Sequence, residues 1–180
     1  MQQPPGDEPP TSRDSSDAAS GGGAAGESST LNSQSGAELS DDSARKPFVV
    51  VAGFGLPGRT LVDELRRRKI PFRVIELNAT TCQRAGTANL EMITGNAADP
   101  GILREAGAER ATLVALMVPN DDVVLAAVQH VRAMNPTCTI IARCAFTSTG
   151  LEAQRRGADQ TLVAEQIVAR DLLTLAKTLL

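Results

Sequence analysis

The 180-residue sequence has no tryptophan and no tyrosine, and its only aromatic residues are four phenylalanines. The hydrophobic core must therefore be built almost entirely from aliphatic side chains. Nucleic-acid binding is not expected, because few rings are available to stack on bases and residues 47–180 carry a net charge of only +2.

Cysteine, histidine and long apolar runs are also scarce. The three cysteines, at positions 82, 138 and 144, have no C-x-x-C or C-x-x-H spacing, so neither a disulfide framework nor a zinc site is expected. His130 is the single histidine, which leaves no metal site in view. No run approaches the roughly 20 apolar residues that cross a bilayer, and the polar N-terminus argues against a secretory leader. These absences predict a reducing, cytoplasmic setting.

Residues 1–46 differ in composition from the rest of the chain. Their only large apolar side chains are Met1, Leu31 and Leu39, and they carry eight acids and three bases, a net charge of −5. So little apolar surface cannot offset the entropy of ordering the chain. We predict a disordered acidic tail at 1–46 and one globular domain at 47–180. The tail is either a solubilising spacer or an acidic segment that folds back on the domain or docks on a partner.

The domain alternates apolar strands with helical patterns. Strands are predicted at 48–52, 72–77, 91–94, 112–117, 139–142 and 160–162, and helices at 57–69, 78–85, 121–134, 147–156 and 163–180, with a short helix after Asp99. Strands that are apolar on both faces and are separated by helices are typical of a parallel sheet. The predicted fold is α/β, a Rossmann-like doubly wound sheet with helices on both faces.

A glycine motif follows the first predicted strand and opens the first helix. Residues 53–58 read GFGLPG, a complete G-x-G-x-x-G. In a dinucleotide fold the first glycine, Gly53, permits the tight turn, Gly55 lets a pyrophosphate approach the backbone, and Gly58 lets helix and strand pack closely. Glu76, at the end of the second strand, is placed to accept hydrogen bonds from a ribose, which favours NAD(H) or an adenosine ligand over NADP(H).

Beyond this motif, the order of several segments resembles the RCK domain (regulator of K⁺ conductance), also called the TrkA N-terminal domain. The resemblance covers residues 48 to about 165 and implies a stand-alone cytosolic module that senses NAD(H), AMP, ADP or ATP, forms dimers and gates potassium channels or transporters. The matching segments are VVVAGFG at 49–55, FRVIELN at 72–78, ITGNAAD at 93–99, LREAGAERA at 103–111, and IIAR at 140–143 with GAD at 157–159.

The resemblance also implies a set of ligand-binding residues, with no catalytic residue and no metal ligand. The glycine loop would line the phosphates, Glu76 would hold the ribose, residues 95–97 would flank the adenine, and Arg143 would lie near the cleft. The predicted cofactor-binding residues are Gly53, Phe54, Gly55, Leu56, Pro57, Gly58, Glu76, Leu77, Asn96, Ala97 and Arg143.

Three positions depart from the family pattern. Asn96 replaces an aspartate, Val124 replaces an asparagine, and Leu56 stands where members that respond to nucleotide triphosphates carry an arginine. The missing cation favours NAD(H) or AMP and leaves ADP and ATP as weaker alternatives. Arg59, just past the loop, either substitutes for that arginine or faces solvent from the first helical turn.

The last predicted helix, 163–180, carries apolar residues at helical spacing. Two interpretations are open: the helix packs on its own sheet, or, as in the family, it crosses to a second copy and forms a homodimer. We favour the homodimer, because leucines such as Leu173 and Leu179 near a free end would be an exposed apolar patch in a monomer.

The sequence and the resemblance together predict a nucleotide-sensing regulatory module rather than an enzyme. The module would gate a separate membrane-embedded potassium channel or transporter and would lie in the cytoplasm, at the inner face of the membrane when bound to it. One alternative is an NAD-dependent oxidoreductase, but the sequence offers no tyrosine, and His130 lies mid-helix. The other is a degenerate Rossmann scaffold. A redox role for Cys144, beside Arg143, would require a lowered thiol pKa.

Overall fold

A computed structural model describes residues 46–86 and 90–180, so the predicted tail lies outside the described residues except for Lys46. Six strands form one fully parallel sheet in the order β3-β2-β1-β4-β5-β6. They are β1 (Val49–Ala52), β2 (Phe72–Glu76), β3 (Met92–Thr94), β4 (Leu113–Leu116), β5 (Thr139–Cys144) and β6 (Gln160–Val163). The helices are α1 (Leu56–Arg67), α2 (Ala79–Gly86), α3 (Pro100–Glu105), α4 (Asp121–Met134), α5 (Thr147–Arg155) and α6 (Ala164–Leu179), with a short 3₁₀ turn, η1 (Ala108–Arg110).

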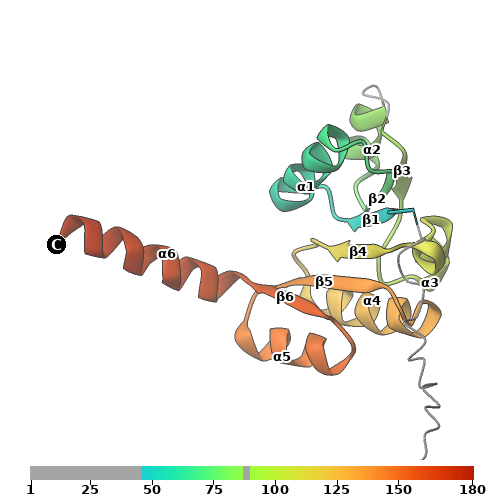
Figure 1. Cartoon of the computed structure of the whole chain (residues 1–180). Coiled ribbons are helices and arrows are strands. Elements are labelled where there is room, and N and C mark those ends of the chain that lie inside the picture. The colour runs from blue at the N-terminus through green and yellow to red at the C-terminus, as the bar shows by residue number, and fades with distance from the viewer. Residues whose placement is uncertain (1–45, 87–89) are drawn as a thin grey trace, which may run out of the picture. The chain divides into compact units, whose positions relative to one another are not determined.

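The sheet separates two apolar cores. Side chains alternate across a strand, so Val51 of β1 packs with Val62 of α1, whereas its neighbour Val50 joins the core that contains Val124 of α4. All four residues of β1 are buried, as expected for a strand covered on both faces. Figure 1 shows α1 and α2 on one side of the sheet and α4 and α5 on the other. The doubly wound fold predicted from the sequence is confirmed.

The chain reverses its direction of winding between β1 and β4. From β1 the chain runs outward through β2 to β3, then returns to place β4 on the other side of β1, paired Val49 to Leu113 and Ala52 to Leu116. In open parallel sheets, ligands bind in the crevice beyond the carboxyl ends of the strands at such a reversal. The topology therefore indicates where a site would form.

Strand β5 runs two residues further than the predicted 139–142. Its pairing with β6 continues through Arg143, opposite Leu162, to Cys144, opposite Val163. Arg143 therefore lies near the end of a paired strand rather than in a loop, and it is half-buried.

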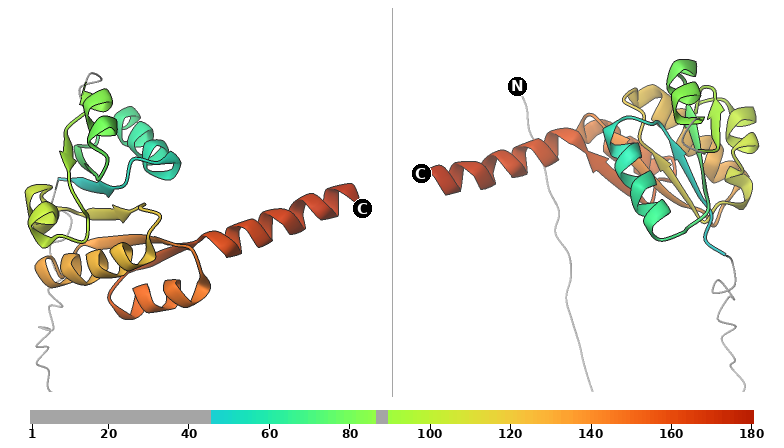
Figure 2. Two further views of the ribbon diagram at one scale, coloured as in Figure 1. Left: turned by 180° about the vertical axis from the view of Figure 1, so that it is seen from behind. Right: turned by 90° about the horizontal axis from the view of Figure 1, so that it is seen from above.

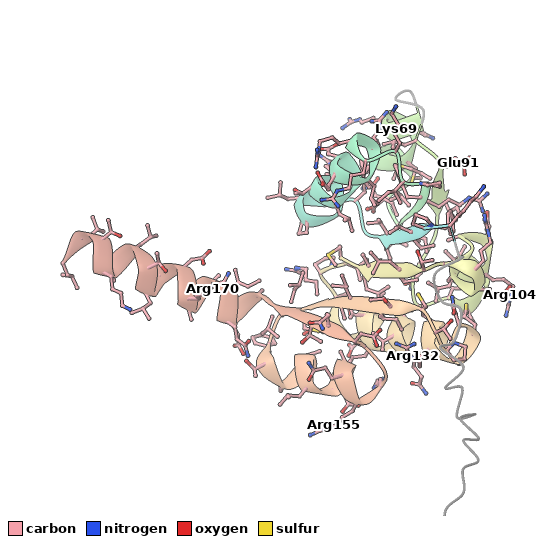
Figure 3. The ribbon with its side chains drawn as sticks, viewed as in Figure 1. Lys69, Glu91, Arg104, Arg132, Arg155 and Arg170 are labelled. Carbon is pink, nitrogen blue, oxygen red and sulfur yellow. The ribbon has the colours of Figure 1, made fainter. Side chains whose placement is uncertain are left out.

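Helix α6 leaves the sheet and projects away from it, as two views from different directions agree (Figures 1 and 2). None of its residues is buried, and Leu172 and Leu175 are 65% and 62% exposed. Figure 3 shows Arg170 on this helix, well clear of the sheet. The interpretation that the helix packs on its own sheet is therefore wrong. Among the described residues, no helix has both the length and the apolar character needed to cross a membrane.

The first residues of α6 are tied to the rest of the domain by two hydrogen bonds in series, one between backbone groups and one from a backbone N–H to a carboxylate. The Glu165 N–H donates to the Ala145 carbonyl (3.3 Å), and the Ala145 N–H donates to the Asp121 carboxylate (3.0 Å). Asp121 is the first residue of α4, directly after its N-cap Asn120. The start of α6 is thus connected to the N-terminus of α4.

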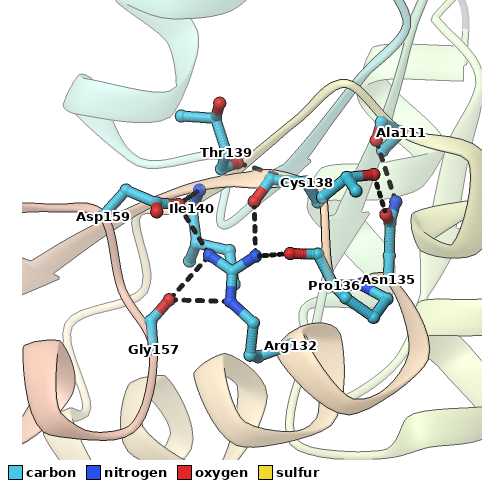
Figure 4. Close-up of polar contacts among 10 residues, drawn as sticks. Ala111, Arg132, Asn135, Pro136, Cys138, Thr139, Ile140, Gly157 and Asp159 are labelled. Atoms are coloured by element: carbon cyan, nitrogen blue, oxygen red, sulfur yellow. Dashed lines mark hydrogen bonds and ion pairs between the residues drawn. The ribbon is translucent and has the colours of Figure 1, made fainter. Parts of the chain in front are cut away.

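Arg132, near the end of α4, joins three segments of the chain (Figure 4). Its guanidinium donates to the carbonyls of Gly157 (2.8 and 3.1 Å), Pro136 (2.6 Å) and Cys138 (2.9 Å), and it forms an ion pair with Asp159 (2.7 Å). The same Asp159 oxygen accepts the N–H of a β5 residue at 2.6 Å. This Arg132 network fixes the amino-terminal ends of β5 and β6 against α4.

Candidate functional site

The three glycines of the loop between β1 and α1 meet three different steric demands. Gly53 has a φ of +99°, which L-residues rarely adopt, and a Cβ there would lie 2.9 Å from the Val118 nitrogen. A Cβ on Gly58 would lie 1.9 Å from the Gly53 carbonyl oxygen. A Cβ on Gly55 would meet no protein atom within 4 Å. The first and third glycines are needed for packing, whereas the second leaves open space.

The first turn of α1 presents uncapped backbone donors. Gly55 is the N-cap and provides no side-chain hydrogen bond, and Pro57 in the first turn has no N–H to satisfy. The N–H groups of Leu56 and Gly58 therefore have no acceptor within the helix. Such donors, together with the helix dipole, attract an anion.

Glu76 lies directly beside this loop. One carboxylate oxygen accepts the Phe54 N–H (2.8 Å) and the other accepts the Asn78 N–H (2.9 Å). The side chain is half-buried. Because each oxygen has further lone pairs, the carboxylate can also accept from a ligand. Glu76 thus links the glycine loop to the turn after β2, in addition to the ribose contact that the sequence predicts.

A cleft of about 690 Å³ opens at the carboxyl ends of the strands, between the two halves of the sheet. Nine of the eleven predicted site residues line it: Gly53, Phe54, Gly55, Pro57, Glu76, Leu77, Asn96, Ala97 and Arg143. Two do not: the Leu56 side chain is 82% exposed, and Gly58 is buried beneath the loop. For Leu56 and Gly58, a role in binding through their backbone N–H groups stays a prediction.

One wall of the cleft was not predicted from the sequence. This wall follows β4 and consists of Met117, Val118, Pro119, Asn120 and Val123. No motif distinguishes these residues; the signal that could have found them is the predicted winding reversal, which brings the end of β4 next to the glycine loop. Asn120 caps α4 by accepting the Val123 N–H (3.2 Å).

Asn96 forms a turn at the end of β3. Its side-chain oxygen accepts the Ala98 N–H (2.9 Å). An amide nitrogen cannot accept a hydrogen bond, so this contact fixes the orientation of the side chain and leaves its NH₂ group available. At this edge of the cleft the side chain therefore offers hydrogen-bond donors.

Two ionisable side chains line the cleft within the described residues, Glu76 and Arg143. They lie on opposite sides of the winding reversal, on β2 and β5. Arg143 makes a long contact with the Val118 carbonyl (3.5 Å). The arrangement combines backbone donors, one carboxylate and one guanidinium around a largely apolar space, as is typical of a binding site with few polar anchors.

The other residues considered from the sequence have structural roles. His130 contacts the Ala98 carbonyl through Nδ1 (3.0 Å), and Val124 is fully buried. Burial raises the pKa of the Cys144 thiol, and the Asp121 carboxylate adds to this effect. The lowered thiol pKa that a redox role would require is therefore contradicted. The described residues contain no cluster of side chains able to hold a metal ion.

The fold and the cleft together place the chain in the class of Rossmann-like domains, with a glycine-rich loop at the winding reversal. A model of the TrkA-N domain family matches residues 49–164. The chain belongs to the TrkA-N domain family, as the sequence resemblance indicated.

Known proteins similar to the chain are mostly much longer. It is 30% identical over 156 residues to a putative cation/proton antiporter, YbaL, of Escherichia coli, covering 84% of this chain and 28% of that protein. It is 27% identical over 126 residues to a putative K⁺ efflux antiporter, KefB, of Alkalimonas amylolytica, covering 70% and 19%. The crystal structure of the TrkA-N domain of E. coli YbaL superposes with a TM-score of 0.68 at 31% identity, covering 71% of this chain and 95% of that one.

Two more distant structures have the same fold and hold nucleotides. The GsuK channel bound to NAD has a TM-score of 0.64, with 74% of this chain and 24% of that chain covered. The Kef carboxy-terminal domain of Shewanella denitrificans in its AMP-bound form has a TM-score of 0.61, with coverage of 73% and 80%. Both are 21% identical to this chain.

Proposed function

We propose that this domain binds NAD(H) or an adenine nucleotide and regulates a potassium channel or transporter. The observation that carries the proposal is the glycine loop at the mouth of the 690 Å³ cleft, with Glu76 hydrogen-bonded to the loop. Family membership and the NAD- and AMP-bound structures of the same fold support it.

Each wall of the cleft has a role in this proposal. The Leu56 and Gly58 N–H groups bind the first phosphate, and Glu76 accepts from the ribose. Because the strand order runs from β1 through β2 to β3, the base extends over the end of β3, beside Asn96 and Ala97. Arg143 faces the ligand from the far side of the winding reversal.

Sensing rather than catalysis is the proposed use of the bound nucleotide. Within the described residues, the cleft lining includes no histidine, lysine, cysteine or tyrosine side chain that could transfer a proton to a substrate. A bound ligand adds charge and volume to the cleft. It shifts the equilibrium between two conformations of the domain only to the extent that it binds them with different affinities.

The proposed target of regulation is a membrane channel or transporter that carries potassium ions. The antiporters similar to this chain are several times its length, and it matches 28% and 19% of them. We place the domain in the cytoplasm, at the inner face of the membrane when it is bound to such a partner.

The first test is the melting temperature of the full chain with NAD⁺, NADH, AMP, ADP, ATP and NADP⁺ in turn. A ligand that binds only the folded state raises this temperature. Gly55→Ala should leave the ligand-free melting temperature within a few degrees, since its Cβ meets no protein atom. It should lower nucleotide affinity at least about ten-fold, because the methyl group occupies the path of the phosphate.

Asp63→Ala is the matched control. Asp63 lies further along the same helix, is exposed and does not line the cleft, so affinity should stay at the wild-type value. No thermal shift with any nucleotide, or equal affinity for wild type and Gly55→Ala, would contradict the proposed site.

We further propose that α6 mediates a homodimer. Val168, Leu172, Leu175 and Leu179 are spaced four, three and four residues apart and are each more than 60% exposed, so they form one apolar stripe along the helix. A two-fold contact would bury the stripe against a second copy of the chain.

Leu172→Arg is expected to convert the dimer to a monomer, since it places an unpaired charge in the interface. Light scattering coupled to size-exclusion chromatography measures the change, and the dimer dissociation constant should rise at least about ten-fold. Thr174→Arg adds the same charge on a different face of α6 and should leave the dimer intact. Equal behaviour of the two variants would argue against this interface.

A further inference from the structure

Arg59 lies in the first turn of α1, three residues after Leu56, and its side chain turns back over the glycine loop. Its Nε–H donates to the Phe54 carbonyl (2.9 Å), and its guanidinium carbon lies over the Phe54 ring, 5.2 Å from the centroid. Side chains on a helix lean toward its N-terminus, which explains how a residue one turn inside α1 reaches the loop. The interpretation of Arg59 as merely solvent-facing is therefore incomplete: it is exposed but held in place.

These two contacts leave most of the guanidinium available. Nε–H is one of five donors on an arginine, and among the described residues no protein acceptor contacts the other four. Arg59 does not itself line the cleft, but its guanidinium contacts Phe54, which does. We call this position, beside the loop and next to a residue of the cleft wall, the rim of the cleft. Leu56 brings no charge to the loop, which makes Arg59 the cation held directly against it.

A ligand with two phosphates would reach the guanidinium at this rim, whereas a ligand with one phosphate would not. If the first phosphate binds the Leu56 and Gly58 N–H groups, a second phosphate bonded to it lies further along the loop, toward the rim. A guanidinium presents paired donors that match two phosphate oxygens, and here the Phe54 ring already restricts its motion.

We propose that Arg59 binds the second phosphate of a pyrophosphate-bearing ligand, either a nucleoside diphosphate or a dinucleotide. The inference rests on the proposed nucleotide site and adds a preference to it. Arg59 sets selectivity against nucleoside monophosphates, which end before they reach the guanidinium.

The test is calorimetric titration of the full chain with AMP, ADP and NAD⁺. Wild type should bind ADP and NAD⁺ about ten-fold more tightly than AMP, which corresponds to about 1.4 kcal/mol. Arg59→Gln should reduce ADP and NAD⁺ affinity to the AMP value and change AMP affinity less than about two-fold. Phe54→Leu, which keeps the charge but removes the ring beneath it, should give an intermediate ratio.

Arg66→Gln is the matched control, because it removes the same charge from the last turn of the same helix. It should leave the ratio of ADP to AMP affinity unchanged. Ligand-free melting temperatures of all variants verify folding.

Three results would overturn the inference. AMP binding as tight as ADP binding in wild type, or an equal loss for all three ligands in Arg59→Gln, would reject the role of Arg59 while leaving the nucleotide site standing. Binding of none of the ligands to wild type would reject the site itself, and the role of Arg59 with it.

Discussion

Gly58→Ala is expected to destabilise the domain by about 2–3 kcal/mol and to abolish nucleotide binding. The added Cβ would lie 1.9 Å from the Gly53 carbonyl oxygen and 3.0 Å from its carbonyl carbon, both backbone atoms that no rotamer change can move. Helix α1 would have to shift away from the loop, an overpacking that typically costs about 1–3 kcal/mol. The same shift would displace the donors at the start of α1.

Thermal unfolding of the ligand-free protein measures this effect, and a fall of about 6–12 °C is expected for a domain of this size. Gly55→Ala is the control, since it adds the same methyl group three residues earlier in open space. If the two variants melted within 2 °C of each other, the close contact between Gly53 and Gly58 would not exist as described.

Arg132→Met should lower the free energy of unfolding by about 2–3 kcal/mol. The substitution keeps most of the side-chain length and removes every donor of the Arg132 network, leaving the Gly157, Pro136 and Cys138 carbonyls without this partner and Asp159 without its cation. Hydrogen bonds to charged groups contribute about 1.5–3 kcal/mol each when well formed. We expect less than their sum because Arg132 remains 25% exposed.

Urea unfolding followed by circular dichroism gives this difference. Arg155→Met is the matched control, since Arg155 pairs with Glu152 at 3.5 Å on an exposed surface of α5 (Figure 3). An exposed pair contributes about 0–1 kcal/mol. Arg132→Lys should restore little, because an ammonium group cannot reproduce the planar fork of donors. A loss no larger than that of Arg155→Met would contradict the structural role of Arg132.

Much of the fold follows directly from local patterns in the sequence. The strand at β1 was predictable because it is an uninterrupted apolar run, and the glycine loop because it combines a strand, three glycines and a helix start. Glu76 was predictable from its spacing along the sequence from Gly53, which places it at the end of the second strand. These features depend on residue type and spacing within one or two neighbouring elements.

Other features depend on contacts that residue spacing does not encode. The Pro119–Asn120 wall enters the cleft only through the winding of the sheet. Arg132 resembles any other basic residue on a helix, yet its donors reach segments up to 27 residues away. The apolar stripe of α6 indicates that the helix packs against something, but a periodic pattern does not distinguish its own sheet from a second copy.

Because α6 is attached to the domain near its first residues, a small rotation there produces a larger displacement of its far end. The helix has 16 residues, so at 1.5 Å per residue it forms an arm about 24 Å long. A tilt of about 5° at its root would carry its far end through about 2 Å at that rise per residue. The root is held by Ala145, which is held in turn by Asp121, the neighbour of Asn120 in the cleft wall. A small displacement of Asn120 would therefore be amplified at the far end of α6, where the proposed contact between two copies of the chain would register it.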